Sequence, residues 1–329
     1  MRGRSNEARS AYLAHVQGFC QNMWMFDIAL SLVPVFSLIA LGAGLRRFNV
    51  LTADVWSSLE RLTYFVLFPP LMFMSIINGS FASDEALWFG LALASAVVTM
   101  TALMLLARPV LAKDGPQFSS VFQAGIRWNG YVALGVVASL HGDVGVGLAA
   151  IGFAVLAPVN NVMSVLVLSR YAGKTPKPFM RVLRSVATDP LILSIAIAVI
   201  LVSLGVRVSK PVGDTLNLLG DATVSLGLIC VGAALDFSLL RTGRWPLAAG
   251  VLLRLVVMPA VAAGLSYTIG LSRIPFEIAM ICVSAPVAIS AYTVARQLGG
   301  DAKLMAGIIT LTTLLSLITI PLTLWLMNG

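Results

Sequence analysis

An arginine and a helix breaker lie inside one of the apolar stretches of the sequence. Residues 126–135 read IRWNGYVALG, so Arg127 stands just before the pair Asn129-Gly130. A charge near the centre of a membrane helix costs about 3 kcal/mol on insertion scales and normally faces a polar cavity or a partner, although an arginine can also snorkel to the interface. Asn-Gly leaves helical geometry at low cost. The spacing favours a broken helix that binds an anion, over a structural kink without a ligand.

A second helix breaker lies in the other half of the chain. Residues 284–290 read SAPVAIS, where Pro286 removes a backbone hydrogen bond and clashes with the preceding turn. Two helices that cross at such breaks expose free N–H groups and positive dipole ends, where an anion can bind. Nearby hydroxyl groups either contact the substrate or belong to packing residues. The candidate substrate-binding residues are Arg127, Asn129, Gly130, Tyr131, Pro286, Val287, Ala288, Ser290 and Tyr292.

Further polar or helix-breaking residues fall within apolar stretches. Asp221 is the most deeply embedded acid and the best candidate for proton coupling, unless it pairs with an arginine or marks a polar helix end. Arg254 either faces the cavity or pairs with an acid to stabilise the scaffold. Asn160 and Asn161 either line the cavity or form hydrogen bonds between helices. The residues that complete the set of cavity or coupling candidates are Gln123, Pro69 and Pro70, the two prolines being expected to kink their helix.

The composition identifies the elements that must position these residues. The chain is 58% hydrophobic and 11% charged, against roughly 25% charged residues in a soluble domain. Its apolar runs are about 20 residues long, the length of a membrane-spanning helix, and lack the alternation of barrel strands. The sequence therefore predicts an all-α integral membrane protein in a lipid bilayer. The net charge of +8 does not indicate a nucleic-acid partner, because the basic residues stand at the ends of apolar runs.

Ten membrane-spanning segments are expected in one domain. Their approximate ranges are 28–46, 58–78, 86–107, 118–140, 145–170, 189–206, 214–236, 245–269, 275–297 and 302–327. Most of the 22 Lys and Arg residues follow odd-numbered segments, so the positive-inside tendency predicts external termini for a multi-pass protein of the inner (plasma) membrane. Residues 1–27 are expected to be an external tail, with translation starting at Met23 or Met25 as the alternative.

Enzyme, metal and nucleotide chemistry find little support in the sequence. Three cysteines and two histidines are too few and too scattered for a disulfide framework, a metal site or a histidine-based triad. Gly173-Lys174-Thr175 resembles the end of a phosphate-binding loop, but Leu168 occupies the position of the required glycine. We expect a protein that is not an enzyme and needs no cofactor.

The two halves of the chain share a weak internal repeat. A shift of 158 residues places Trp128 on Pro286 and Gly130 on Ala288, and a shift of 160 places Arg47 on Arg207. Either shift divides ten segments into five and five, so the second unit must run inverted through the membrane, as in secondary transporters. We expect the first repeat in residues 28–171, a cytoplasmic linker in 172–188 and the second repeat in 189–329.

Two motifs resemble the auxin efflux carrier family, which includes plant auxin exporters and bacterial malonate-type carriers. They are FQAGIRWNGYVALGVVASLHG at 122–142 and the run that begins PVAISAYTVARQLGG at 286, and the similarity covers the chain from about Met25. The resemblance implies the inverted-repeat fold of sodium/proton antiporters and bile acid symporters. Helices 1, 2, 6 and 7 would form a scaffold that often makes a homodimer, and the others would move like an elevator.

The resemblance also implies where the substrate binds. Discontinuous helices 4 and 9 would cross and hold a carboxylate, with the family's asparagine at Asn129 and its proline at Pro286. The chain departs from the family at Val136, where many members have a proline. We therefore expect a secondary transporter that exports malonate, malate or auxin-like acids; the alternatives are a sodium-coupled symporter and a membrane receptor that binds without transport.

Overall fold

The computed structural model describes residues 28–79, 83–172, 184, 187–241 and 244–328. Within these ranges the chain is helical, and β pairing is limited to one isolated bridge. The expected tail, including both alternative start residues, and most of the expected linker lie outside the described residues. The all-α prediction is confirmed for the part of the chain that the structure describes.

The first half of the chain forms helices that match the first five expected segments. In order they are the helix Ile28–Arg47, α2 (Ala53–Leu62), the π-helical segment η1 (Thr63–Leu67), α3 (Phe68–Ile77), α4 (Ser83–Leu106), α5 (Arg108–Leu111), α6 (Gly115–Ile126) and α7 (Gly130–Tyr171). Pro69 and Pro70 stand at the start of α3, which continues from α2 through η1 as one helix, and the π-helical turn just before them accommodates the prolines.

The second half repeats this pattern of long and interrupted helices. Its elements are α9 (Pro190–Ser203), α10 (Lys210–Ala233), the 3-10 segment η2 (Phe237–Arg241), α11 (Arg244–Leu252), the π-helical segment η3 (Leu253–Val257), α12 (Met258–Ile269), α13 (Arg273–Ser284), α14 (Ser290–Leu298) and α15 (Ala302–Asn328). The expected fourth and ninth segments are therefore each interrupted, the fourth between α6 and α7 and the ninth between α13 and α14.

Seven helices among the described residues are long and apolar enough to cross a membrane. One of them, α7, has 42 residues, which at about 1.5 Å per residue is twice the thickness of a bilayer core of roughly 30 Å. Gly142 divides it, because its φ of 58° and ψ of −153° are not helical. The two parts of α7 correspond to the end of the fourth and the whole of the fifth expected segment. Ten crossings in two inverted repeats remain a prediction.

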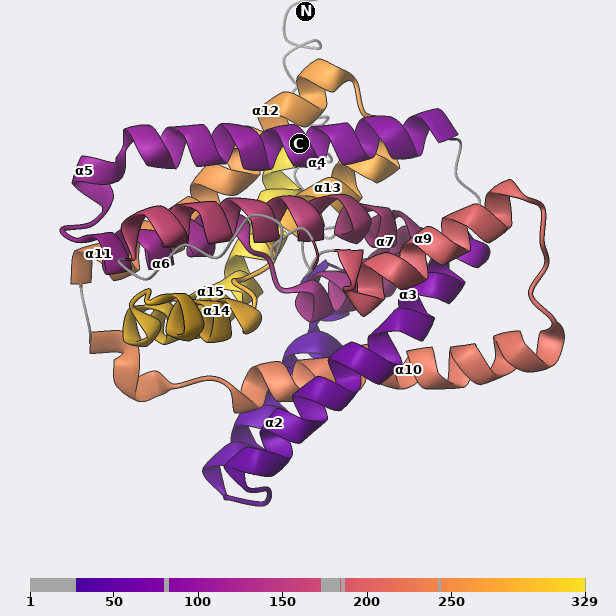
Figure 1. Cartoon of the computed structure of the whole chain (residues 1–329), viewed down its shortest axis with the longest axis horizontal. Helices are drawn as coiled ribbons and strands as arrows, with labels where there is room; N and C mark the ends of the chain where they lie inside the picture. Colours follow the sequence, from indigo (N-terminus) through magenta and orange to yellow (C-terminus); the bar gives the residue numbers. More distant parts are fainter. Residues whose placement is uncertain (1–27, 80–82, 173–183, 185–186, 242–243, 329) are drawn as a thin grey trace, which may run out of the picture.

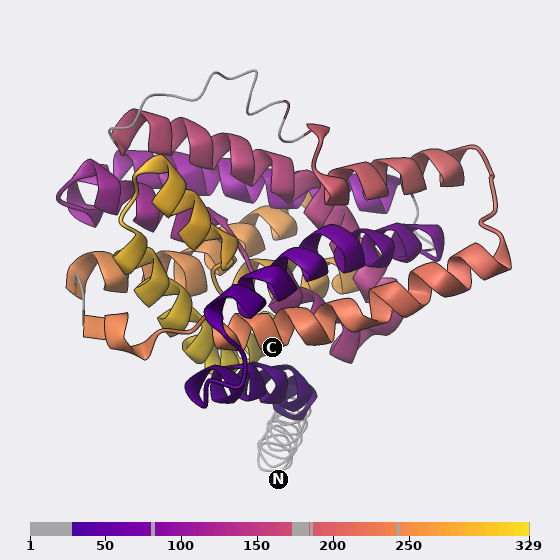
Figure 2. The same ribbon diagram turned by 60° about the horizontal axis from the view of Figure 1, so that its bottom comes forward.

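The helices pack as two groups. The first, which we call the scaffold group, contains the helix Ile28–Arg47, α2, α3, α9 and α10; α3 packs against both α9 and α10, and Figure 2 shows α2 and α3 running beside α10. The second, the core group, contains α4, α6, α7 and α11 to α15, with α4 packed against α7 and α12 (Figure 1). Contacts of α7 with α3 and α10 join the groups.

Candidate functional site

The two helix breaks meet each other inside the core group. Trp128 and Val287 form an isolated antiparallel β bridge between them. The Asn129 N–H donates to the Pro286 carbonyl at 2.8 Å, and the Ala288 N–H donates to the Arg127 carbonyl at 3.3 Å. Main-chain groups that the helices leave unpaired are thus satisfied across the crossing, as in a short sheet ladder. The structure brings together the two segments that the sequence predicted to be breakers.

The first break is capped by its own sequence. Arg127 has an extended backbone, and α7 begins at Gly130 with Asn129 as its N-cap. The Asn129 Oδ1 accepts hydrogen bonds from the N–H groups of Tyr131 at 3.1 Å and Val132 at 3.3 Å. An asparagine N-cap satisfies donors that have no partner within the helix. Asn129 therefore both ends the extended segment and starts the next helix.

Arg127 reaches from the first break to the second. Its Nη1 donates to the Asn161 Oδ1 at 3.1 Å, and its Nη2 donates to the Ser290 Oγ at 3.3 Å. Both partners are neutral, and within the described residues the ion pairs do not include Arg127. The guanidinium charge therefore adds to the positive dipole ends of α7 and α14, whose N-termini lie at the breaks.

The second break depends on residues from other helices. The Val287 N–H donates to the Thr312 Oγ1 of α15 at 3.3 Å. At the end of α13, Arg254 donates from Nε to the Ala285 carbonyl at 2.7 Å and from Nη2 to the Cys282 carbonyl at 3.3 Å. Arg254 is fully buried, and its described hydrogen-bond partners are these carbonyl groups and no acid. Its place in the structure is thus that of a cap for a helix C-terminus.

Aromatic rings surround the start of α7. The Tyr131 ring stacks on Phe68 with ring centroids 5.1 Å apart, and Trp128 lies 4.6 Å from Phe153. Phe153 also lies so close to Gly130 that a Cβ atom there would come within 1.8 Å of the ring, so glycine is needed for this contact. Among the described residues, the buried Tyr131 hydroxyl has no hydrogen-bond partner.

The remaining candidates divide into three groups by location. Gln123 and Asn160 are buried, with amide atoms that have no partner among the described residues. Tyr292 lies at the cavity described next. Asp221 is exposed on α10, away from the crossing, and Pro69 and Pro70 lie in α3. The structure therefore gathers most of the predicted residues at the crossing, places Arg254 behind the second break as a cap, and leaves Asp221 and the prolines elsewhere.

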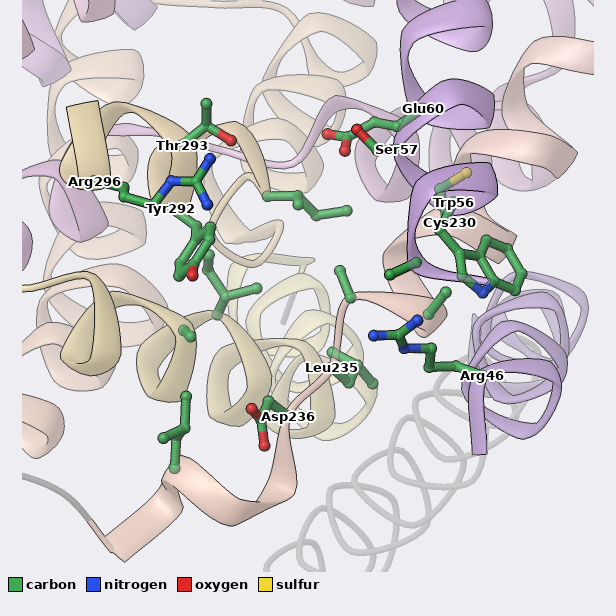
Figure 3. Close-up of a pocket in the computed structure, with 17 residues that line it drawn as sticks. Arg46, Trp56, Ser57, Glu60, Cys230, Leu235, Asp236, Tyr292, Thr293 and Arg296 are labelled. Carbon is green, nitrogen blue, oxygen red and sulfur yellow. The ribbon is translucent and has the colours of Figure 1, made fainter. Parts of the chain in front are cut away.

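A cavity of about 590 Å³ lies next to the second break, between the two groups of helices (Figure 3). Ser57 and Glu60 of α2 line one wall, and Tyr292 and Arg296 of α14 line the opposite wall. Arg46 and Asp236 lie at its lower part in this view. Sequence reasoning missed Ser57, Glu60 and Arg296, although the spacing of Ser57, Glu60 and Tyr64 marks a polar face at helical intervals.

Comparison with known proteins points to membrane transport. Residues 167–324 match the family model described as "Membrane transport protein". An uncharacterized transporter of Methanothermobacter thermautotrophicus is 27% identical over 296 residues, which cover 89% of this chain and 96% of the relative. An uncharacterized transporter of Methanocaldococcus jannaschii is 23% identical over 304 residues, with the same two coverages.

Proposed function

Taking the chain as a membrane transport protein of the auxin efflux carrier family, which the family match and both relatives support, we propose that it exports small organic anions. The substrate class is carboxylates such as malonate, malate or auxin-like acids. The observation that carries the proposal is the crossing of two broken helices around Arg127, whose partners Asn161 and Ser290 are neutral. A cation without an acid partner, next to two helix N-termini, favours an anionic ligand.

The chemistry of carboxylate binding follows from these groups. A guanidinium presents two parallel N–H donors that match the two oxygens of a carboxylate. Such a ligand would replace Asn161 and Ser290 as partners of Arg127. Each of these neutral side chains could then form a hydrogen bond with another part of the substrate. Peptide N–H groups in the first turns of α7 and α14 add partial positive charge in the same place. The aromatic rings of Tyr131 and Phe68 supply apolar surface for larger acids.

We propose that transport proceeds by an elevator movement. The crossing lies within the core group, and the cavity lies between the core group and the scaffold group, so sliding of one group along the other would carry the crossing across the membrane. Helices α3 and α10 would form the surface along which α7 slides. Only a movement that carries both breaks together would keep their shared hydrogen bonds intact.

Sodium-driven symport is a second candidate function. The observation in its favour is that the buried amide oxygens of Gln123 and Asn160 have no hydrogen-bond partner among the described residues. Sodium ions are bound by oxygen ligands, and amide oxygens can serve. Anion transport that continues unchanged when choline replaces sodium would remove this candidate.

Substitution of Arg127 tests the proposed substrate site. Purified protein in proteoliposomes is expected to exchange at least one of labelled malonate, malate and indole-3-acetate in a counterflow assay. Arg127→Ala should weaken binding of that acid by about tenfold or more, because a hydrogen bond to a charged group contributes roughly 1.5–3 kcal/mol. Exposed Arg207, between α9 and α10, provides the control Arg207→Ala.

The outcomes separate the possible functions. Equal binding and counterflow in Arg127→Ala and the wild type would contradict the role given to Arg127. Binding of an acid without counterflow would indicate a receptor and overturn transport. Failure of the wild type to bind or exchange any organic anion would overturn the proposed function as a whole.

A further inference from the structure

The cavity beside the second break carries four charged side chains on different elements. Arg46 comes from the helix Ile28–Arg47, Glu60 from α2, Asp236 from the segment after α10, and Arg296 from α14. Two are cationic and two are anionic at neutral pH, so the lining of the cavity is formally neutral. Within the described residues these four side chains form no ion pair with one another.

Of the two acids that line the cavity, Glu60 is the one whose carboxylate has fewer partners among the described residues. Its side chain is half-buried, and it points into the cavity from the wall opposite Arg296 (Figure 3). The described residues give its carboxylate no hydrogen bond. Asp236 differs, because it is exposed and its Oδ1 accepts hydrogen bonds from the Ser238 N–H at 3.0 Å and the Ser238 Oγ at 2.6 Å.

The cavity leads to the proposed substrate site. Ile289 and Tyr292, which line it, flank Ser290, the hydroxyl partner of Arg127. The count of basic residues in the sequence predicts that Arg46 and Arg296 lie on the cytoplasmic side. An organic anion that approaches the crossing from the cytoplasm would therefore pass between Glu60 and Arg296.

Charge balance then links the anion to a proton. Each negative charge of an organic anion is uncompensated in the formally neutral cavity, which is costly where the local dielectric constant is low. The anion also attracts Arg296 and so weakens the stabilisation that Arg296 gives to the ionised Glu60 carboxylate. A second negative charge nearby favours the neutral carboxylic acid form of Glu60. One proton taken up by the Glu60 carboxylate offsets one of these negative charges, which restores neutrality for a monocarboxylate, and the carboxylic acid can then donate a hydrogen bond to the anion.

We propose that Glu60 takes up one proton for each organic anion that enters the cavity, so that the protein moves proton and anion together in the same direction. This inference rests on the proposed function and names its coupling ion. Glu60 replaces Asp221 in this role, because Asp221 lies exposed on α10 and does not line the cavity.

The groups that face Glu60 come from every element around the cavity. The charged and titratable side chains are Arg46 on the helix Ile28–Arg47, Cys230 on α10, Asp236 after α10, Tyr131 on α7, and Tyr292 and Arg296 on α14. The lining residues of α15 are Ala306 and Ile309, which carry no charge. Arg296 and Arg46 are permanently charged at physiological pH, and the exposed Asp236 carboxylate accepts hydrogen bonds from Ser238, so Glu60 is the residue that can change charge to meet the anion.

Proteoliposomes with a trapped pH indicator test the coupling. The probe is whichever of labelled malonate, malate and indole-3-acetate the wild type exchanges best, and liposomes without protein give the passive leak. The wild type should carry about one proton per anion, and a pH gradient should drive uptake. Glu60→Gln keeps the size of the side chain but cannot change charge, so it should still exchange the anion while its proton flux falls to the level of the leak.

A binding measurement provides the second readout. Where the anion itself stays ionised, its affinity for the wild type should rise about tenfold per unit decrease in pH, because one proton binds with it. In Glu60→Gln the affinity should not depend on pH. Asp54→Asn is the matched control, since Asp54 is an exposed acid in the first turn of the same helix and lies outside the cavity. It should retain the behaviour of the wild type.

Each outcome bears on one of the two proposals. Anion exchange by the wild type without proton flux would overturn the coupling and leave the proposed function standing. This measurement uses the wild type alone and does not depend on whether a variant folds. Proton flux retained in Glu60→Gln would also overturn the assignment to Glu60. Failure of the wild type to bind or exchange any of the three acids would overturn the proposed function, and the coupling with it.

Discussion

The breaks at residues 127–129 and 285–289 occupy matching places in the two interrupted helices but satisfy their backbone groups differently. At the first, the Asn129 side chain caps the helix that follows it. At the second, α14 has no side-chain cap, and Arg254 and Thr312 from other helices supply the hydrogen bonds. An asparagine can both break and cap a helix, whereas a proline breaks it and leaves the freed groups to other partners. The first break is therefore supported locally, and the second by tertiary structure.

Arg254→Met should give the largest loss of stability, because it removes the distant support of the second break. Methionine fills similar space but cannot donate, so the Ala285 and Cys282 carbonyls lose a charged partner in the interior. We expect a cost of about 2–3 kcal/mol. Thermal unfolding in detergent is the measurement, with Arg207→Met as the exposed control; an unchanged midpoint would contradict the support that we assign to Arg254.

Thr312→Val should have a smaller effect on the same break. It leaves the fully buried Val287 N–H without its acceptor, at a cost of about 1–2 kcal/mol. The neighbouring Thr313 is also buried, but its hydroxyl bonds only the Ile309 carbonyl of its own helix, so Thr313→Val is a matched control. If both variants shifted the unfolding midpoint equally, the hydrogen bond from Val287 to Thr312 would contribute nothing specific to stability.

Asn129→Asp should change stability least and binding most clearly. Aspartate caps a helix as well as asparagine does, and its buried charge has Arg127 nearby to compensate it, so the free energy of unfolding should stay within about 1 kcal/mol of the wild type. Its negative charge beside Arg127 should nevertheless repel an organic anion and weaken binding by about tenfold or more. Asn129→Ala, which loses about 1 kcal/mol of capping without adding charge, separates the two effects. Tight anion binding by Asn129→Asp would contradict an anion site at the first break.

The breakers themselves were predictable from the sequence, but their partners were not. Asn129-Gly130 and Pro286 act on the backbone within a few residues, so the sequence alone indicates where the helices stop. Asn161 and Thr312 lie 34 and 25 residues from the groups that they bind. Nothing in the sequence ties them to those groups, because many polar residues could have filled the same role.

The two acids Asp221 and Glu60 show the same limit of prediction from the sequence. Counting residues along a helix made Asp221 the more deeply placed acid, but the direction in which a side chain points depends on how the helix is rotated against its neighbours. Packing exposes Asp221 on α10 and turns Glu60 on α2 into the cavity. The choice between them is made by packing of the helices near α2 and α10 against α14 and α15 from the end of the chain.

By itself the sequence determined that the protein is built from apolar helices of membrane length and that two of them are interrupted, because hydropathy and backbone chemistry act over a few residues. Tertiary structure decided that the interruptions meet, that Arg127 spans them while Arg254 caps a helix end, and that Glu60 faces Arg296 across a cavity. The crossing and the cavity join residues more than a hundred positions apart, and the Arg254 cap joins residues 31 positions apart. Only packing of the complete set of helices brings such residues together.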